Sequence, residues 1–297
     1  MSVVKGRSVR FRGRHLFFFR PSKVFTILLL ACFLCFMALP LIYTFSLAFK
    51  PIREMFLFPP KFFVRQPTLQ NFKDLLTAFE SAEIPFSRYF FNSLFVTVIT
   101  VAGTVVVSTM GAYGLVKHRP KGADLIFALV VAALSFSTHV TQIPSYVIVR
   151  SLGMMDSFAA LIIPKIGVAY NLFLIKQTLE QMPDAYLEAA RLDGANEWQI
   201  YTKITMPFLK PACATLVVFS FISSWNDYFS PVVYITNPVL KTMPLAVQNI
   251  SGGAGAASIS TMGAMAAASI ITLLPTVIIF TTMQTKVLST MAHSGIK

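Results

Sequence analysis

Long apolar runs separated by shorter polar stretches are the main pattern of this sequence. A transmembrane helix needs about 20 mostly apolar residues to cross about 30 Å of hydrocarbon, because only a backbone that satisfies its own hydrogen bonds is stable there. The pattern therefore predicts an all-α, polytopic membrane protein. Six stretches are long and apolar enough to be transmembrane helices, over residues 24–49, 90–116, 124–149, 158–175, 212–234 and 263–283.

Two of these six spans are interrupted by polar or helix-breaking residues. Pro144 shortens the third span near its end, whereas Pro164, Lys165, Gly167 and Asn171 interrupt the fourth. We expect the fourth helix to lie among neighbouring helices rather than against lipid. The composition supports the membrane assignment, since 55% of the residues are hydrophobic and 12% are charged, compared with about 45–50% and about 25% in soluble domains.

Basic residues in the short loops predict the orientation in the membrane. All charged residues of the N-terminal tail, residues 1–23, are Lys or Arg, and the loop 117–121 carries three more. Because such loops favour the cytoplasm, both termini and the stretch 183–211 are predicted to be cytoplasmic, and the loop 50–88 extracytoplasmic. The net charge of +13 is concentrated in these flanking segments, which indicates contact with membrane lipids and no nucleic-acid partner.

The sequence contains no recognisable catalytic or metal-binding constellation. Cys32 and Cys35 have the spacing of a redox pair but lie inside an apolar helix, where small thiols are packing groups. The Gly-rich phosphate-binding sequence, the nucleophile elbow and the zinc-protease pair are absent. We therefore predict no catalytic residue, no metal site and no cofactor on this chain, so that any ATP is bound by another chain. The four histidines lie in separate regions without ligand spacing, at His15, His118, His139 and His293.

The most informative polar segment is the stretch 183–211, between the fourth and fifth spans. Pro183 and Asp184 suit the start of a helix, because proline fits the first turn and an acidic side chain interacts favourably with the helix dipole. Gly194 suits its end, because glycine adopts the left-handed conformation at low cost. The residues between them are mostly good helix formers, so a short helix is predicted here.

A second short helix is predicted after this turn. Asn196 and Gln199 have the spacing of a capping box, and Pro207 and Pro211 are expected to close the helix before the fifth span. Two functions remain open for the two helices: a docking surface for a partner, or an amphipathic hairpin that lies on the membrane without one. The residues expected to contact the partner or the membrane face are small or apolar: Leu187, Ala189, Ala190, Ala195, Trp198, Ile200 and Ile204.

The same segment carries a family resemblance. It resembles the EAA loop of bacterial ATP-binding-cassette importer permeases, with Met206 where leucine is usual. The shared positions are Glu188, Ala189, Ala190, Gly194, Ile204 and Pro207. Further stretches are similar to the maltose-type (MalG-like) carbohydrate permeases, and the likeness covers nearly the whole chain. These stretches are residues 69–72, 89–93, 112–113, 190–195 and 225–228.

The resemblance implies a non-catalytic permease subunit of the bacterial inner membrane. It implies three partners: an ATPase dimer that holds ATP and magnesium, a second homologous permease and an extracytoplasmic solute-binding protein. Its permease core spans residues 89–284, between the outer loop 50–88 and a cytoplasmic tail, residues 285–297. The EAA loop, with its two short helices, would couple ATP hydrolysis to the membrane helices. The coupling residues implied are Glu188, Ala189, Ala190, Arg191, Asp193, Gly194, Trp198, Ile204 and Pro207.

Ionisable residues within the spans indicate a solute path. Each is costly in the membrane and marks a pathway or pairs with another. At about 1.5 Å per residue, His139, Lys165 and Asp227 lie about 10 Å inside the outer boundary, so we predict that Lys165 and Asp227 pair with His139 close by. The alternative is that Lys165 reaches the headgroups while Asp227 caps a helix break before Pro231. The candidate path residues are His139, Gln142, Lys165, Tyr170, Asn171, Trp225, Asn226 and Asp227.

The residues of the path alone do not identify the solute or the class of transporter. The aromatic and amide groups of the path suit a sugar, but such groups also pack and hydrogen-bond between helices. The resemblance favours a sugar or oligosaccharide, with glycerol phosphate, polyols and polyamines as alternatives. A secondary transporter would be expected to show an internal repeat with matching broken helices, which the sequence lacks. For an intramembrane enzyme, His139 and Asp227 are the only suitable pair.

Overall fold

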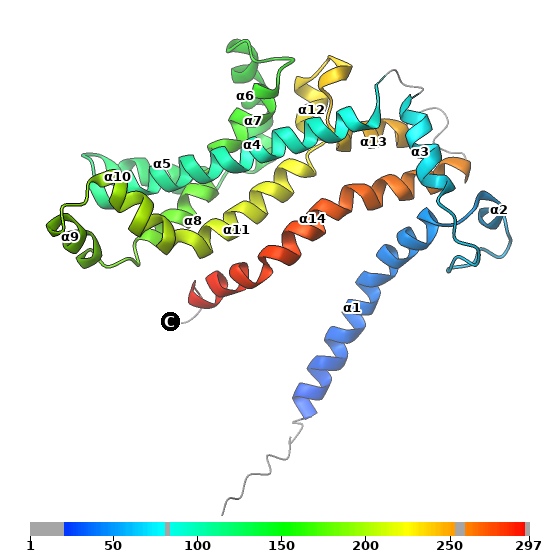
Figure 1. Cartoon of the computed structure of the whole chain (residues 1–297), viewed down its shortest axis with the longest axis horizontal. Helices are drawn as coiled ribbons and strands as arrows, with labels where there is room; N and C mark the ends of the chain where they lie inside the picture. Colours follow the sequence, from blue (N-terminus) through cyan, green and yellow to red (C-terminus); the bar gives the residue numbers. More distant parts are fainter. Residues whose placement is uncertain (1–20, 81–83, 253–258, 295–297) are drawn as a thin grey trace, which may run out of the picture. The chain divides into compact units, whose positions relative to one another are not determined.

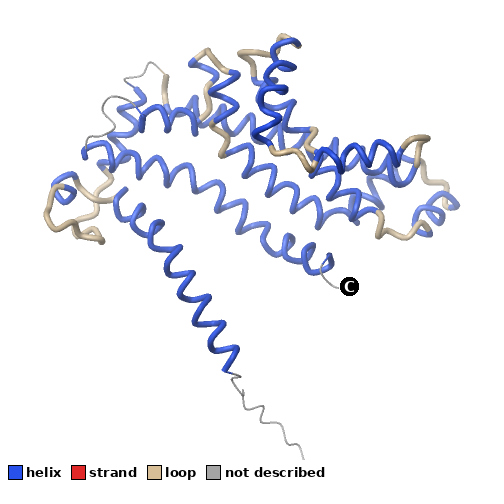
Figure 2. The backbone as a smooth tube through the Cα atoms, turned by 180° about the vertical axis from the view of Figure 1, so that it is seen from behind, coloured by secondary structure: helices blue, strands red, loops and turns tan. Residues whose placement is uncertain are grey.

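The computed structural model describes residues 21–80, 84–252 and 259–294, and every regular element within these ranges is helical. Figure 2 shows this all-helical backbone. The chain divides into two compact units, residues 1–44 and residues 45–297. The predicted all-α class is confirmed. Most of the predicted basic tail, residues 1–20, lies outside the described residues.

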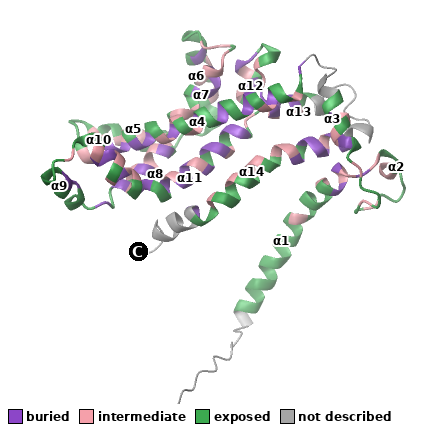
Figure 3. Cartoon of the chain, in the orientation of Figure 1, coloured by how far each residue is buried: buried purple, intermediate pink, exposed green. Residues whose placement is uncertain are grey.

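The described part of the first unit is helix α1, Pro21–Ala48, up to Thr44. Its side chains are largely exposed, as Figure 3 shows, including Leu34, Phe36 and Met37. Residues Lys23–Ala48 are long and apolar enough to cross a membrane. An exposed helix that is apolar all round is suited to lipid rather than water, and it matches the predicted first span.

The second unit contains the rest of the helices (Figure 1). In order they are α2 (Ile52–Met55), α3 (Gln70–Glu80), α4 (Phe86–Tyr113), the π-helical turn η1 (Gly114–His118), α5 (Ala123–Ala133), α6 (Thr138–Ser151), α7 (Phe158–Ile166), α8 (Ala169–Leu179), α9 (Ala185–Leu192), α10 (Glu197–Ile200), the π-helical turn η2 (Tyr201–Thr205), α11 (Met206–Trp225), α12 (Phe229–Tyr234), the 3₁₀ turn η3 (Pro238–Leu240), α13 (Met243–Gly252) and α14 (Ile259–Ser294).

Helices α4 and α11 form the centre of this unit. They pack against each other, α14 packs against α11, and α7 and α8 pack against α4; Figure 1 shows α4, α11 and α14 running side by side. Buried side chains concentrate on α4 and α11 (Figure 3). Several of those on α4 are hydroxyls, including Thr97, Thr100, Thr104 and Ser108. The central helix pair therefore buries polar groups beside its apolar core.

The predicted third span is not one straight helix. Helix α5 ends at Ala133 and α6 begins at Thr138, with a bend of 114° between them. The break falls at residues 134–137 and not at Pro144, which lies inside α6. Serine and threonine hydrogen-bond the backbone in non-helical conformations, and Ser135 and Ser137 lie in this break. The prediction of a single span shortened at Pro144 was wrong.

The fourth and fifth spans are interrupted close to the predicted polar residues. The fourth consists of α7 and α8, which are separated at Gly167 and Val168 and together make an apolar run over Phe158–Leu179. In the fifth, α11 ends at Trp225 and α12 begins at Phe229. The predicted continuous fifth span, residues 212–234, is therefore a long helix followed by a separate short one.

The remaining boundaries also differ from those predicted. The second span, Phe86–His118, includes η1, and the sixth lies within α14, which continues to Ser294. The predicted tail, residues 285–297, is thus largely helical where it is described. Together the described residues contain five helices able to cross a membrane, or six if the bent pair α5 and α6 is one span.

Candidate functional site

The start of α9 is fixed by a lysine of η1, the turn that follows α4. Lys117, in η1, donates hydrogen bonds to the Met182 carbonyl at 3.0 Å and to Asp184 Oδ1 at 2.7 Å. The Lys117 side chain is only 3% exposed, whereas that of Asp184 is 64% exposed. The hydrogen bond and charge of Lys117 lower the pKa of the Asp184 carboxyl. Sequence analysis used this lysine only for orientation and missed its contact.

The turn between α9 and α10 follows the predicted chemistry. Gly194 has a φ of +80°, and its N–H donates to the Arg191 carbonyl at 3.0 Å, while Ala195 N–H donates to the Ala190 carbonyl at 2.9 Å. This is a Schellman motif, in which a left-handed residue lets the last carbonyls find donors. The prediction that Gly194 ends the helix is confirmed.

A capping box opens the next helix. Gln199 N–H donates to Asn196 Oδ1 at 2.8 Å, and Asn196 N–H donates to Gln199 Oε1 at 2.9 Å. Two backbone donors that the first helical turn leaves unpaired are satisfied in this way. The predicted capping box is confirmed.

The second predicted short helix does not end before the membrane. Helix α10, η2 and α11 form one continuous helical run over Glu197–Trp225, so the prediction that Pro207 and Pro211 close it was wrong. Met206 N–H donates to the Tyr201 carbonyl, five residues earlier. A π-helical turn shifts the backbone hydrogen bonds by one residue directly before Pro207. Pro207 then lies in the first turn of α11, where the proline ring and its missing N–H are tolerated.

The faces of this two-helix EAA loop point in opposite directions. Leu187, Ala190 and Ile200 are buried in a cluster with residues of α4, α8 and α11. These three side chains pack within the chain, so a contact of theirs with a partner or the membrane face stays a prediction. The predicted coupling residues that are exposed are Glu188, Ala189, Arg191, Asp193, Gly194 and Trp198.

Two exposed apolar side chains of α9 were not among the predicted coupling residues. Leu192 is 90% exposed and Tyr186 is also exposed. Apolar side chains are usually expected to be buried. The apolar character of Leu192 and Tyr186 therefore gave no indication that they are exposed. For Leu192, which lies about 140° from Leu187 around the helix, spacing on a helix of 3.6 residues per turn separates it from the buried face; Tyr186 is four residues before Ala190, so spacing alone does not predict its exposure.

Hydrogen bonds connect the EAA loop to α4. Tyr113 Oη donates to Glu197 Oε2 at 2.7 Å, and Arg191 pairs with Glu197 Oε1 at 3.1 Å. One turn further along, the hydroxyls of Thr109 and Tyr201 lie 2.7 Å apart in a buried contact. The loop is therefore connected by hydrogen bonds to α4 and, through the continuous helix, to α11.

At the other end of α11, the predicted ion pair is present. Lys165 Nζ, near the end of α7, lies 2.5 Å from Asp227 Oδ2, in the break between α11 and α12. Asp227 Oδ1 also accepts a hydrogen bond from Ser230 N–H at 3.1 Å. The two alternatives for Asp227 are thus compatible, because one carboxylate oxygen pairs with Lys165 while the other caps α12.

A cavity of about 180 Å³ lies beside this pair. Lys165 is its one charged lining residue, and Tyr170 and Phe219 contribute aromatic rings 6.1 Å apart. Thr100 and Ser220, 1% and 7% exposed, have hydroxyl oxygens with no hydrogen-bond partner among the described residues. Buried hydroxyls normally have partners, so this cavity is suited to a polar solute. The full lining is Thr100, Lys165, Val168, Tyr170, Asn171, Phe219, Ser220 and Ser223.

Trp225 and Asn226 do not join this cavity. Trp225 is 1% exposed, packs on Phe221 and Phe90, and its indole N–H donates to the Thr272 carbonyl at 2.9 Å. The ring belongs to the core, and its contact with solute stays a prediction. Asn226 instead lines a different cavity with Tyr228 and residues of α13 and α14.

His139 and Gln142 lie on α6, beyond the 114° bend. The His139 side chain is exposed, and no hydrogen bond or ion pair within the described residues joins it to Lys165 or Asp227. Its predicted proximity to the pair is not supported by any contact. The roles of His139 and Gln142 in a solute path stay predictions.

Within residues 21–80, 84–252 and 259–294, no three His, Cys, Asp or Glu side chains are grouped as a metal site would require. Cys32 and Cys35 lie on exposed positions of α1, and Cys213 is half-buried in α11. His15 lies outside the described residues. What the site offers chemically is hydrogen bonding, charge pairing and mechanical connection.

Comparisons with known proteins agree with this arrangement. Residues 13–291 match the family described as binding-protein-dependent transport system inner membrane component. The chain is 27% identical over 284 residues to the arabinooligosaccharides transport system permease protein AraQ of Bacillus subtilis (strain 168), covering 94% of this chain and 99% of that protein. It is 30% identical over 274 residues to the inner membrane ABC transporter permease protein YcjP of Escherichia coli (strain K12), covering 90% and 94%.

The fold also matches a solved structure. A chain from the crystal structure of a bacterial ABC transporter involved in the import of the acidic polysaccharide alginate gives a TM-score of 0.80 at 25% identity, covering 91% of this chain and 98% of that one. The resemblance seen in the EAA loop is confirmed by these matches. The chain belongs to the family of inner membrane components of binding-protein-dependent transport systems.

Proposed function

We propose that this chain forms half of the translocation path of an ATP-binding-cassette importer for a carbohydrate. The observation that carries the proposal is the continuous helix Glu197–Trp225. Its first turn belongs to the EAA loop, and Phe219, Ser220 and Ser223 near its far end line the polar cavity. A force applied to the loop is thereby transmitted to the solute cavity.

The partner at the loop is proposed to be an ATPase dimer. The exposed Glu188, Ala189 and Leu192 would contact it, while Gly194 sets the angle between the two helices. ATP and magnesium belong to that partner, and this chain holds no cofactor and catalyses no reaction. A second homologous permease completes the path, and an extracytoplasmic binding protein delivers the solute. Both termini lie in the cytoplasm, as the distribution of basic residues favours.

A carbohydrate suits the cavity for two reasons. The rings of Tyr170 and Phe219 can stack on the apolar face of a sugar, and the hydroxyls of Thr100, Ser220 and Ser223 can bond its hydroxyl groups. The named relatives of this family that transport arabinooligosaccharides and alginate support the same class. Organic phosphate is the second candidate, because Lys165 could bind its charge; calorimetry of the binding protein with both ligand classes separates them.

Reconstitution tests the function. The full complex in proteoliposomes should hydrolyse ATP and take up a labelled oligosaccharide when the loaded binding protein is present. This chain alone should do neither. Solute uptake by the isolated chain, driven by an ion gradient, would instead assign a secondary transporter.

A further inference from the structure

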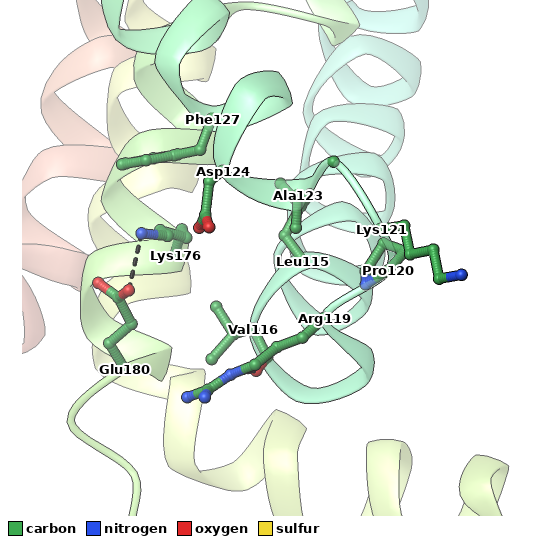
Figure 4. Close-up of a pocket in the computed structure, with 11 residues that line it drawn as sticks. Leu115, Val116, Arg119, Pro120, Lys121, Ala123, Asp124, Phe127, Lys176 and Glu180 are labelled. Atoms are coloured by element: carbon green, nitrogen blue, oxygen red, sulfur yellow. Dashed lines mark hydrogen bonds and ion pairs between the residues drawn. The ribbon is translucent and has the colours of Figure 1, made fainter.

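A further cavity, of about 510 Å³ (Figure 4), lies at the opposite end of the helices from the cavity beside Lys165. It is lined by the loop after η1, the first turns of α5 and the last turn of α8. Three apolar spans meet at it: one ends at His118, one ends at Leu179, and the bent pair begins at Ala123. Its polar lining is therefore at the level of the lipid headgroups.

The lining carries both signs of charge. Figure 4 shows Arg119 extending past Val116 toward Glu180, and the Asp124 carboxylate facing Lys176, whereas the Lys121 ammonium extends away from the cavity. Lys176 Nζ pairs with Glu180 at 2.7 Å and lies 3.5 Å from the centre of the Phe127 ring. Lys176 is therefore already held by neighbouring groups.

Two charged groups of this cavity are left without such partners. Arg119 uses its Nε to donate to the Val116 carbonyl at 3.1 Å, and no partner of its terminal nitrogens is found in the described part of the chain. Asp124 likewise accepts no hydrogen bond from the described residues. The two groups have opposite charge and share one cavity, yet no ion pair joins them. Arg119 also has a φ of +42°, a conformation that costs a non-glycine residue energy.

We propose that this cavity binds the phosphoethanolamine headgroup of a membrane phospholipid. The phosphodiester would accept hydrogen bonds from the Arg119 guanidinium, whose planar fork suits phosphate. The primary ammonium would donate to Asp124 and to the outer oxygen of Glu180. Phosphatidylglycerol fits less well, because its net negative charge would face the carboxylates of Asp124 and Glu180. Phosphatidylcholine fits less well because its quaternary ammonium has no N–H to donate to them. The inference is independent of the solute that the permease carries.

Native mass spectrometry of the detergent-purified full chain with its partner subunits tests this site. The complex is titrated with phosphatidylethanolamine, phosphatidylglycerol or phosphatidylcholine of the same acyl chains. Phosphatidylethanolamine should bind about tenfold more tightly than phosphatidylcholine, since a hydrogen bond to a charged group contributes about 1.5–3 kcal/mol. Equal affinities, or a preference for phosphatidylglycerol, would overturn the proposal without any variant being made.

Three variants then assign the site. Asp124→Asn should remove the preference for phosphatidylethanolamine over phosphatidylcholine, and Arg119→Gln should weaken both lipids. Lys121→Gln, a charge removed from the same loop but directed away from the cavity, should change neither. Loss of lipid only with Lys121→Gln would place binding elsewhere. Displacement of the lipid by soluble phosphoethanolamine at similar concentration would assign the cavity to a soluble ligand and contradict a lipid site.

Discussion

Two lysine–aspartate pairs mark opposite ends of the permease core, and they differ in how far their charges are removed from solvent. In Lys165–Asp227 both side chains are largely withdrawn, at 19% and 14% exposure. In Lys117–Asp184 only the lysine is withdrawn, and the aspartate is 64% exposed. The first pair joins two interrupted spans beside the cavity of about 180 Å³; the second fixes the start of the EAA loop.

The difference in exposure between the two pairs predicts different effects when one partner is removed. Removing one member of a largely buried pair leaves the other charge without its counter-charge, which is strongly destabilising. Removing the lysine of a pair whose carboxylate is exposed leaves a charge that water still solvates, so the free energy of folding changes little. The pair beside the cavity should therefore be required for the fold, and the contacts around the EAA loop for transmission of motion.

The largest effect is expected at the pair beside the solute cavity. Lys165→Met should lower the stability of the complex by about 3–5 kcal/mol, because Asp227 is left unpaired. The thermal melting of the purified complex and its uptake of solute measure this. Exchanging the charges, Lys165→Asp with Asp227→Lys, should recover part of the loss. A double variant that is no better than either single variant would show that the pair contributes no coupling energy.

A smaller effect is expected at the turn of the EAA loop. Gly194→Ala should cost about 1–2 kcal/mol through its left-handed backbone, and it should lower the stimulation of ATP hydrolysis by the loaded binding protein. No atom lies within 4 Å of an added Cβ at Gly194, so the effect is conformational. Gly114→Ala is the matched control, since that site is equally open but has a φ of −60°. Equal losses in both variants would contradict the role given to the turn.

The capping box should matter less. Asn196→Ala removes the acceptor of Gln199 N–H and is expected to cost about 1 kcal/mol. Because the capped helix continues into α11, coupling efficiency should fall with little change in solute affinity. Coupling efficiency is the ratio of solute uptake to ATP hydrolysis, and both are assayed in the same proteoliposomes. An unchanged ratio would indicate that the cap is structural only.

The smallest effect on stability is expected for Lys117→Met. Lys117 lowers the pKa of Asp184, so its contribution is present at neutral pH and is lost as the pH falls through the folded-state pKa of Asp184. The wild type and the variant should therefore differ at neutral pH and converge in acid. Melting temperatures of the wild type and of Lys117→Met, measured from neutral to acid pH, test this direction. A difference between the two melting temperatures that grows in acid would contradict it.

The sequence predicted local chemistry better than the course of the helices. Gly194, the Asn196–Gln199 capping box and the Lys165–Asp227 pair follow from residue type and spacing. The bend between α5 and α6 and the run through Pro207 do not, because a π-helical turn or a helix break is decided by packing against neighbours. Burial was the other failure: Trp225 and Ala190 have the residue types of a site, but tertiary contacts turn both inward.

Crosslinking of adjacent alanines in the EAA loop tests the central claim most directly. After replacement of the three native cysteines, Ala189→Cys or Ala190→Cys is introduced into the full complex and treated with a short crosslinker. Cysteine at exposed position 189 should link to the ATPase subunit, with a yield that changes when nucleotide is added. Cysteine at buried position 190 should not. Equal yields at both positions, or no link to the ATPase from either, would contradict this loop as the coupling surface.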